Sequence, residues 1–431
     1  MESSTTQTQS PATPIYILRG HGAPIHALHI FNQNLRLASG DANGWIVIWD
    51  LVTKRPTAVW KAHAGAVLEL KGFNFDSGVT EIYTHGRDHK LCVWKIRLED
   101  EEFLDKTLPV DMADPIEEGS KTQPWLLHSM PVNALNFCAF SMKFTNDDGL
   151  SVSPSPASEK PKNTLFAVPN ALDSGGVDIF HLPSERRIST IPSESSTKTG
   201  MLMAVNIFVT PVGDLFVVSA YEDGQVMVYA HRGALKAASF EIEHIRNYPL
   251  KWERLYAARP HTQPVLSLDV AACHTHFVSS SADALIVKHP IPSLASAGYI
   301  PTAGYKEESP LKVVNTRHSG QQGLRIRSDG KVFATAGWDS RVRVYSGKTM
   351  KELAVLKWHQ DGCYAVAFGG IGTPSSANSA AQQSPTTSET EVFAREYSLA
   401  SVQQQRNRKV QQTHWLAAGS KDGKISLWDI Y

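Results

Sequence analysis

A short pattern recurs along the whole chain and constrains its fold more than any other feature. Each copy has an Asp six residues before an aromatic residue, and apolar residues alternate with exposed positions before the aromatic. Three weaker copies have Asn43, Ser174 and Asp283 at the Asp position. The four clear copies are AYEDGQVMVY, AGWDSRVRVY, GSKDGKISLW and HGRDHKLCVW, which begin at Ala220, Ala336, Gly419 and His85. Seven copies of one supersecondary unit indicate a repeat protein.

The residue types in each copy are those of two strands joined by a tight turn. A His precedes most copies, and we expect it to lie on the loop into the innermost strand and to hydrogen-bond the turn Asp of its own blade. These histidines are His21, His63, His128, His261, His318 and His359. The structural pairs predicted in this way are His63 with Asp88, His261 with Asp283, His318 with Asp339, and His359 with Asp422.

Four-stranded units repeated seven times predict an all-β fold, a seven-bladed WD40 β-propeller. The last copy stops after its third strand, which runs from Gly423 to Tyr431. The alternating segment from Ile15 to Leu18 can supply the missing fourth strand. We therefore expect the N-terminal strand to pair into the last blade and close the ring, which would leave no open sheet edge between the chain ends.

The repeats run from end to end and predict one domain, although the length of 431 residues alone would suggest about three. We expect residues 1–13 to be a disordered tail and residues 14–431 to be a single propeller. Insertions are expected at about 98–123, 141–162, 232–260 and 370–413. The first two should be mobile, the third should form a short outer helix, and the fourth is low-complexity sequence between two strands of the last blade.

Charge and composition narrow the class of partner. Lys plus Arg and Asp plus Glu both total 42, so no global field attracts nucleic acid, and no apolar run approaches ~18 residues. We therefore expect neither direct nucleic-acid binding nor a membrane partner. Four widely separated cysteines indicate a reduced intracellular protein. The run Arg406, Arg408 and Lys409 is either a weak nuclear-import signal or, more commonly for such runs, a solvated basic patch.

The sequence indicates no catalytic site, metal site or cofactor. Cys273, His274 and His276 lie together but fit no common zinc spacing. The glycines at Gly370 and Gly372 lack the Lys-Ser/Thr of a phosphate-binding loop, and no GxSxG nucleophile motif occurs. We therefore predict that the protein is not an enzyme.

The residue before each turn Asp should point toward one face of the ring. Four of these residues are predicted to bind a protein partner: Arg87, Glu222, Trp338 and Lys421. An exposed Trp beside Arg and Lys is typical of an interface anchor. In the alternative interpretation, the charged residues are solvated loop tips and Trp338 leans on its neighbour.

Several segments resemble the ASTRA-associated WD-repeat protein family, whose counterparts are called G-protein-beta-subunit-like proteins. They are GDANGWIVIWDLVTKRPTAVWKAH, HGRDHKLCVWKI, AYEDGQVMVY, ATAGWDSRVRVYSGKTMKELAVLKWH and LAAGSKDGKISLWDIY. The resemblance implies a nuclear scaffold subunit of the ASTRA complex, linked to chromatin remodelling. It also implies partners among the protein subunits of that assembly and in the co-chaperone complex that matures phosphatidylinositol-3-kinase-related kinases. The family supplies no catalytic residues.

The WDSR run at Trp338 to Arg341 indicates an alternative function. It resembles the WDxR box by which some propellers dock onto a ubiquitin-ligase adaptor, so the alternative is a substrate receptor of a ubiquitin ligase. That box follows the third strand of a blade, whereas WDSR is expected on the turn before that strand. The register therefore favours the scaffold.

Overall fold

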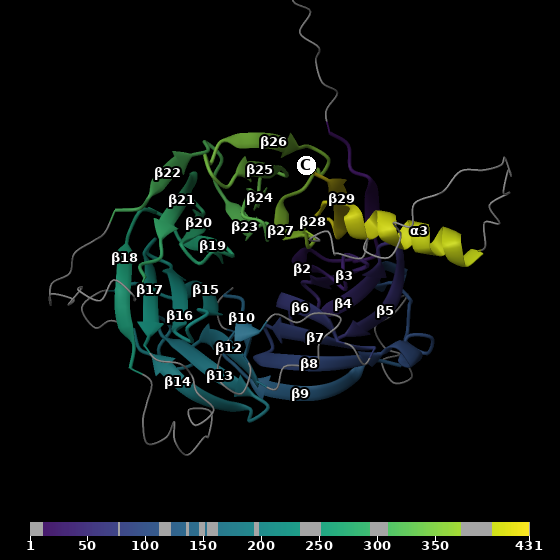
Figure 1. The fold of residues 1–431 in the computed structure, drawn as a ribbon, viewed down its shortest axis with the longest axis horizontal. Coiled ribbons are helices and arrows are strands. Elements are labelled where there is room, and N and C mark those ends of the chain that lie inside the picture. The colour runs from purple at the N-terminus through teal and green to yellow at the C-terminus, as the bar shows by residue number, and fades with distance from the viewer. Residues whose placement is uncertain are drawn as a thin grey trace, which may run out of the picture.

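The chain forms a ring of seven β-sheets, each of which is one blade (Figure 1). The structure is a computed structural model, and it describes residues 12–75, 78–111, 122–134, 138–145, 151–152, 163–193, 198–232, 251–293, 309–371 and 399–430. The predicted seven-bladed propeller is confirmed. In the described residues, no helix is long and apolar enough to cross a membrane.

The first three blades follow the chain from the second strand onward. Blade 1 contains β2 (Ile25–Phe31), β3 (Arg36–Asp41), β4 (Trp45–Asp50) and β5 (Arg55–Lys61). Blade 2 contains β6 (Val67–Phe75), β7 (Val79–Gly86), β8 (Lys90–Arg97) and β9 (Trp125–Pro131). Blade 3 contains β10 (Ser141–Thr145), β11 (Ser151–Val152), β12 (Asn163–Pro169), β13 (Val177–Leu182) and β14 (Arg186–Ile191).

The remaining blades repeat the same order, from an inner strand to an outer one. Blade 4 contains β15 (Leu202–Val209), β16 (Leu215–Tyr221), β17 (Val226–His231) and β18 (Glu253–Ala258). Blade 5 contains β19 (Val265–Val270), β20 (His276–Ser281), β21 (Leu285–Pro290) and β22 (Lys312–Asn315). Blade 6 contains β23 (Gln321–Ile326), β24 (Val332–Gly337), β25 (Val342–Ser346) and β26 (Glu352–Leu356). Blade 7 contains β27 (Cys363–Phe368), β28 (Trp415–Ser420), β29 (Lys424–Asp429) and, from the other end of the chain, β1 (Tyr16–Arg19).

The N-terminal strand closes the ring as predicted. β1 pairs antiparallel with β29, and Tyr16 lies opposite Leu427 while Leu18 lies opposite Ile425. The amide of Ile15 adds a further bond to the carbonyl oxygen of Leu427 at 2.7 Å. Leu18 is 1% exposed and packs in the core between blades 7 and 1. The two ends of the chain are therefore held in one sheet.

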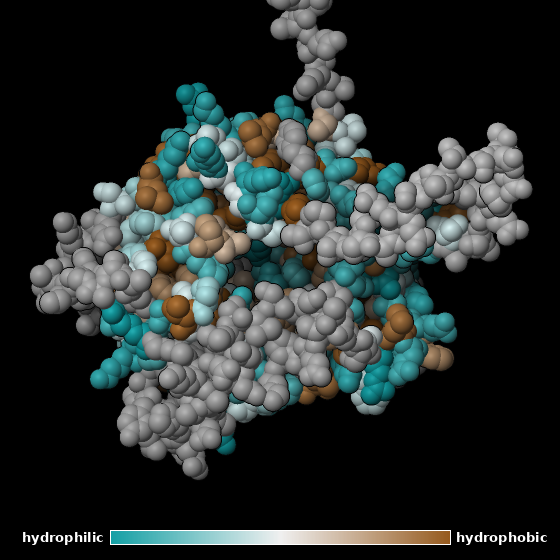
Figure 2. Space-filling model, in the orientation of Figure 1, coloured by the Kyte–Doolittle hydropathy of each residue, from teal (hydrophilic) through white to brown (hydrophobic). Residues whose placement is uncertain are grey.

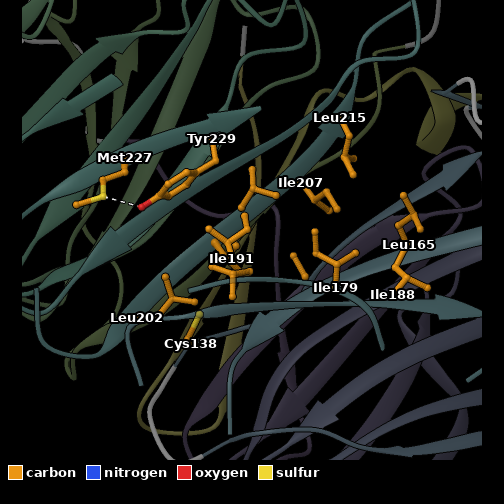
Figure 3. Close-up of a cluster of buried hydrophobic side chains, with 14 of the residues drawn as sticks. Cys138, Leu165, Ile179, Ile188, Ile191, Leu202, Ile207, Leu215, Met227 and Tyr229 are labelled. Atoms are coloured by element: carbon orange, nitrogen blue, oxygen red, sulfur yellow. Dashed lines mark hydrogen bonds between the residues drawn. The ribbon is translucent and has the colours of Figure 1, made fainter. Parts of the chain in front are cut away.

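The hydrophobic core is divided among the seven interfaces between neighbouring blades, and each interface has its own cluster of buried side chains. Figure 3 shows the cluster between blades 3 and 4, where Ile179 and Leu165 of blade 3 meet Ile207 and Leu215 of blade 4. Within it the Tyr229 hydroxyl donates to the sulfur of Met227 at 3.0 Å. Each blade is thus buried on both faces, so positions of the third strands that were expected to be exposed, such as Arg343 and Ser426, are buried as well.

Two expected insertions have different bounds in the structure. Residues 141–145 are not part of an insertion, because β10 pairs with β12 as the inner strand of blade 3. Residues 98–111 were expected to be mobile, yet they pack against blade 1. They contain two short 3-10 helices, η1 (Leu98–Asp100) and η2 (Pro109–Asp111). The amide of Val59 in β5 donates to the Asp105 carbonyl oxygen at 2.8 Å, and Leu104 is buried in the core between blades 1 and 2.

The other two insertions also include ordered structure. Residues 253–258 form β18, so the third insertion ends before them, and the helix expected within 232–260 falls on residues 233–250, which lie outside the described part. The fourth insertion ends in a helix that the sequence analysis missed, α3 (Leu399–Gln412), which extends outward from the ring in Figure 1. Arg406, Arg408 and Lys409 are exposed on this helix.

Candidate functional site

The seven inner strands surround a central channel with a volume of about 910 Å³. Figure 2 shows the ring hollowed at its centre. The second residue of an inner strand and the fifth residue both face this channel in most blades, because they lie three positions apart on strands that begin with a bulge. The side chains at the second position are His26, Leu68, Met203, Leu266, Gln322 and Tyr364, and those at the fifth are His29, Lys71, Asn206, Asp269, Arg325 and Ala367.

Deeper in the channel, around the fifth residues of the inner strands, the lining side chains are charged. The guanidinium of Arg325 in blade 6 forms an ion pair with Glu69 of blade 2, across the channel. The Lys71 ammonium lies 3.7 Å from Glu69, and the amide of Ile326 donates to the Asp269 carboxylate at 2.7 Å. Burial raises the pKa of Asp269 and lowers the pKa of Lys71. These groups satisfy one another, so they hold the blades together rather than present free charge to a ligand.

The mouth of the channel is aromatic on one side. Trp338 is 48% exposed, and its indole N–H donates to the Gln322 side-chain oxygen at 2.6 Å. One face of the ring lies on Gly320, where φ is +72° and a Cβ would come within 2.1 Å of the indole. The alternative interpretation, in which Trp338 packs against its neighbour, thus holds for one face of the indole only. The other part of the ring is open to solvent.

A second pair of rings continues the mouth toward blade 1. His26 of blade 1 stacks on Tyr364 of blade 7 with centroids 5.5 Å apart and planes 4° from parallel. Burial lowers the pKa of His26, opposed by the nearby Asp41 and reinforced by the charge of Arg87. The His26 ring is therefore neutral near pH 7 where it stacks on Tyr364.

The structure brings three of the four predicted partner-binding residues to this mouth. Trp338 and Tyr364 both lie next to Gly362, and the Lys421 amide donates to the Gly362 carbonyl oxygen at 2.9 Å. Arg87 lies on the turn between β7 and β8, and it is close enough to His26 for its charge to lower the pKa of that histidine. We call His26, Arg87, Trp338, Tyr364 and Lys421 the aromatic rim; it spans blades 6, 7, 1 and 2.

Glu222 lies apart from the aromatic rim. It is on the β16–β17 turn of blade 4, where its carboxylate accepts the Met201 amide at 3.1 Å. Its contacts are thus local to its own blade. The four residues predicted from the repeat do not form a single cluster.

The histidine pairs serve the fold, and their geometry differs between blades. The Nδ1 atom of His63 lies 2.9 Å from the Asp88 carboxylate, and Nε2 lies 2.8 Å from the Thr84 hydroxyl. His261 makes the same kind of contacts, 3.2 Å to Asp283 and 2.8 Å to Ser279. Blade 1 has an equivalent arrangement that the aspartate pattern missed. There His21 bonds Asp41, two residues before Asn43, at 2.8 Å.

Two predicted pairs are not hydrogen-bonded. His318 lies 3.7 Å from Asp339 and is exposed, because it stands three residues before the inner strand, where His63 and His261 stand four before theirs. Gln321 takes its place and accepts from the Thr335 hydroxyl at 2.6 Å. Asp339 instead binds Arg343 at 2.6 Å.

In blade 7 a lysine after the turn displaces the histidine. His359 is buried and its Nε2 lies 2.8 Å from the Ser426 hydroxyl, but Asp422 bonds the Lys424 ammonium at 2.7 Å. His128 is also misassigned, since it lies within β9, opposite Val93, and approaches Glu185 at 2.5 Å. Asn133 follows it on the loop toward blade 3 and donates to the Asn170 carbonyl oxygen at 2.7 Å.

Sequence reasoning missed His26 and Tyr364, the two residues that make the aromatic rim continuous. They lie outside the Asp-to-aromatic pattern, so the repeat gave no reason to select them. What could have identified them is their position, since each is the second residue of an inner strand and such residues face the channel. The WDSR run lies, as expected, on the turn between β24 and β25, where the Arg341 side chain bonds the Ser340 hydroxyl and the His359 carbonyl oxygen.

Similarity to known proteins shows the family of this chain. A family model described as ASTRA-associated protein 1 matches residues 14–428, which includes all seven blades. The chain belongs to the ASTRA-associated protein 1 family. A family member of that name from Penicillium rubens is 74% identical over 100% of both chains. The Aspergillus niger member is 60% identical over 98% of each chain, and the Schizosaccharomyces pombe member is 32% identical over 83% of this chain and 93% of its own.

The family assignment confirms the resemblance inferred from the repeat segments. Because the matched region begins at residue 14, it includes the closing strand β1. The propeller with its closure is therefore the part of the chain that matches the family. The candidate site in this family member is the aromatic rim, together with the charged channel beneath it. Among the described residues, no group of three or more His, Cys, Asp or Glu side chains is placed to hold a metal ion.

Proposed function

We propose that this chain is a non-catalytic scaffold subunit of the ASTRA assembly, which binds other protein subunits through the aromatic rim. The observation that carries the proposal is the continuity of the rim across four blades. An exposed Trp, a stacked His–Tyr pair and two cations, Arg87 and Lys421, form one surface at the channel mouth. Aromatic residues and Arg are the commonest energetic anchors of protein interfaces. The name of these relatives, ASTRA-associated protein 1, supports the ASTRA assembly as the place where the chain acts.

The chemistry of the rim favours a partner segment that carries apolar and acidic residues. Trp338 and Tyr364 present ring surface beside the exposed cations Arg87 and Lys421. Deeper in the channel, Arg325 and Glu69 neutralise each other, so this region does not favour a partner of either charge. A segment with a bulky apolar side chain flanked by Asp or Glu would satisfy both features.

The wider role extends the same proposal. The proposed scaffold acts in the nucleus, with a second pool in the cytoplasm, and takes part in chromatin remodelling and in the co-chaperone-assisted maturation of phosphatidylinositol-3-kinase-related kinases. The family resemblance supports this role. Contact with chromatin would be through protein partners, since the net charge of the chain is zero.

The test is affinity purification of the full chain from its own cells, with quantification of the ASTRA subunits that accompany it. A variant with Trp338→Ala and Arg87→Glu should recover those subunits about tenfold less well, because loss of a Trp anchor usually weakens binding by that much or more. Glu222→Ala is the matched control, an exposed turn residue of blade 4, and should recover them normally. Full recovery by the folded double variant would show that the rim is not the docking site.

A further inference from the structure

The outer strand of blade 2 departs from the pattern of four other blades. The residue opposite the third-strand aromatic is Pro56 in blade 1, Arg187 in blade 3, Arg254 in blade 4 and Glu352 in blade 6. In blade 2 that residue is Leu126, opposite Trp94, and Trp125 precedes it. Charges and proline on an edge strand prevent other chains from pairing with it. Blade 2 lacks this protection at two consecutive positions.

These side chains form an apolar surface with a residue of the 98–111 segment. Trp125 is 70% exposed, Leu126 49% and Leu127 39%, and Phe103 is 73% exposed. Phe103 and Trp125 line one shallow pocket of about 70 Å³, together with buried Leu104. We call Phe103, Trp125, Leu126 and Leu127 the β9 patch. Exposed apolar groups of this size usually mark a contact with another molecule.

The backbone of β9 is also available. In the order β6-β7-β8-β9 the strand has β8 on one side, and no other strand in the described part of the chain pairs with its second edge. In blade 1, by contrast, the 98–111 segment covers the outer strand. There the Val59 amide of β5 donates to the Asp105 carbonyl oxygen at 2.8 Å. The outer edge of β9 can accept an added strand in the same way.

Most of the charged side chains beside the patch are acidic; the cation is Lys95, which lies opposite Trp125 and lines the same pocket. Residues 99–102 read Glu-Asp-Glu-Glu, and Glu101 is paired with Arg36 while Glu99 is paired with Arg97. Asp100 and Glu102 have no cation within ion-pair distance among the described residues, and Asp100 lines the same pocket as Trp125. A partner that carries Lys or Arg would complement them.

We propose that the β9 patch binds an extended segment of a partner protein, which adds as a strand beside β9. The segment alternates bulky apolar residues, one of which enters the pocket between Phe103 and Trp125, with Lys or Arg residues that face Asp100 and Glu102. This surface differs from the aromatic rim in position and in charge preference. The proposal does not depend on the function proposed above.

The test uses the full-length chain and a phage-displayed library of random twelve-residue peptides. Peptides selected on the chain are synthesised, and their affinities are measured by fluorescence anisotropy. We expect the selected peptides to combine apolar and basic residues. Their affinity should fall at least tenfold for Trp125→Glu and several-fold for Glu102→Lys. The matched control is Leu353→Glu, an exposed apolar residue of the outer strand of blade 6, which should bind as the unchanged chain does.

Each other outcome overturns the proposal. Selection of no peptide, of acidic peptides, or of peptides that bind Trp125→Glu equally well would show that the patch does not take this ligand. A dimer in sedimentation that Trp125→Glu converts to monomer would identify a second copy as the occupant. Peptide binding that is detected only after residues 112–121 are replaced by a Gly/Ser linker would show that the chain itself occupies the patch. Trp338→Ala should leave the peptide affinity unchanged, which separates this surface from the aromatic rim.

Discussion

At the scale of single residues, the position of one histidine relative to its inner strand decides whether it stabilises a blade. His63 stands four residues before Val67, at the start of β6, and is buried between Asp88 and Thr84. His318 stands three residues before Gln321 and is exposed. The sequence shows that a histidine precedes the turn Asp in both repeats. Whether the side chain reaches the Asp depends on a single residue of spacing.

This difference predicts unequal costs for the same substitution. His63→Ala removes one hydrogen-bond partner each from the buried Thr84 hydroxyl and the Asp88 carboxylate, and should lower the free energy of unfolding by about 1–3 kcal/mol. His318→Ala removes an exposed side chain that is 3.7 Å from Asp339, and should cost less than about 1 kcal/mol. Urea unfolding of both variants measures this. Equal losses would contradict the spacing argument.

Buried histidines also make the stability of the propeller depend on pH. Burial lowers the pKa of His85 to about 3, with the nearby His63 adding to the effect, and burial lowers the pKa of His359 to about 4. In the unfolded chain both pKa values are about 6.5. Between pH 6.5 and these lower values, the unfolded chain binds protons that the folded chain does not.

The contribution of these two histidines to stability should therefore be constant above about pH 7 and fall as the pH drops below 6.5, by up to about 1.4 kcal/mol per pH unit for each histidine. His85→Gln should make the decline between pH 6 and 4.5 shallower by about one proton. Urea unfolding in that range provides the measurement. A slope unchanged by the substitution would mean that His85 is protonated in the folded chain.

At the scale of elements, the fourth insertion is anchored at both of its ends by one side chain of blade 1. Asn34, in the β2–β3 turn, donates to the Gly370 carbonyl oxygen at 2.9 Å and to the Gln411 carbonyl oxygen at 3.0 Å. It also accepts the Gly370 amide at 2.8 Å. Asn34 is 4% exposed, so these bonds are protected from water.

This anchoring predicts that the propeller tolerates loss of the middle of the insertion but not loss of the anchor. Replacing residues 372–398 with twelve Gly/Ser residues should change the free energy of unfolding by less than about 1 kcal/mol, since loop length affects closure entropy only weakly. Twelve extended residues also exceed the length of α3, about 21 Å. Asn34→Ala should cost about 1–3 kcal/mol. The opposite ranking in thermal or urea unfolding would show that the insertion itself stabilises the ring.

The elements also show where sequence patterns reach their limit. The strands around each turn Asp were predictable because apolar alternation and turn residues coincide there. β10 was not, because Ser141 to Thr145 has no turn Asp and is followed by Ser/Pro-rich sequence. α3 was missed because its composition is Gln-rich and polar, and only Val410 is buried against Trp415. Tertiary contacts fix β10, whereas the Gln, Arg and Lys residues of α3 favour a helix locally, and what α3 lacks is an apolar stripe that would reveal it.

At the scale of the whole molecule, closure makes the two ends of the chain depend on each other. Deleting residues 1–12 leaves Ile15 and all of β1 in place, and should leave the melting temperature unchanged. Deleting residues 1–18 removes buried Leu18 and most of β1, and should cost at least about 2 kcal/mol from lost apolar burial alone. An unchanged melting temperature in the longer deletion would contradict closure by β1.

The function of the whole molecule was less accessible to sequence reasoning than its fold. Blade number and closure follow from counting repeats, since each copy lies in its own blade. The aromatic rim does not follow from counting, because Trp338, Tyr364 and His26 come from three blades and meet only when the ring closes. Glu222 was included with them because it has the same place in its repeat, although its blade lies elsewhere in the ring.

The most direct measurement of the central claim is hydrogen exchange of this chain, free and within the purified ASTRA assembly. The scaffold account predicts slower exchange in the assembly at residues 336–342, 360–366 and 84–90, which carry Trp338, Tyr364 and Arg87, while residues 220–225 around Glu222 exchange as in the free chain. Unchanged exchange at all three rim segments, with protection confined to other parts of the propeller, would contradict it.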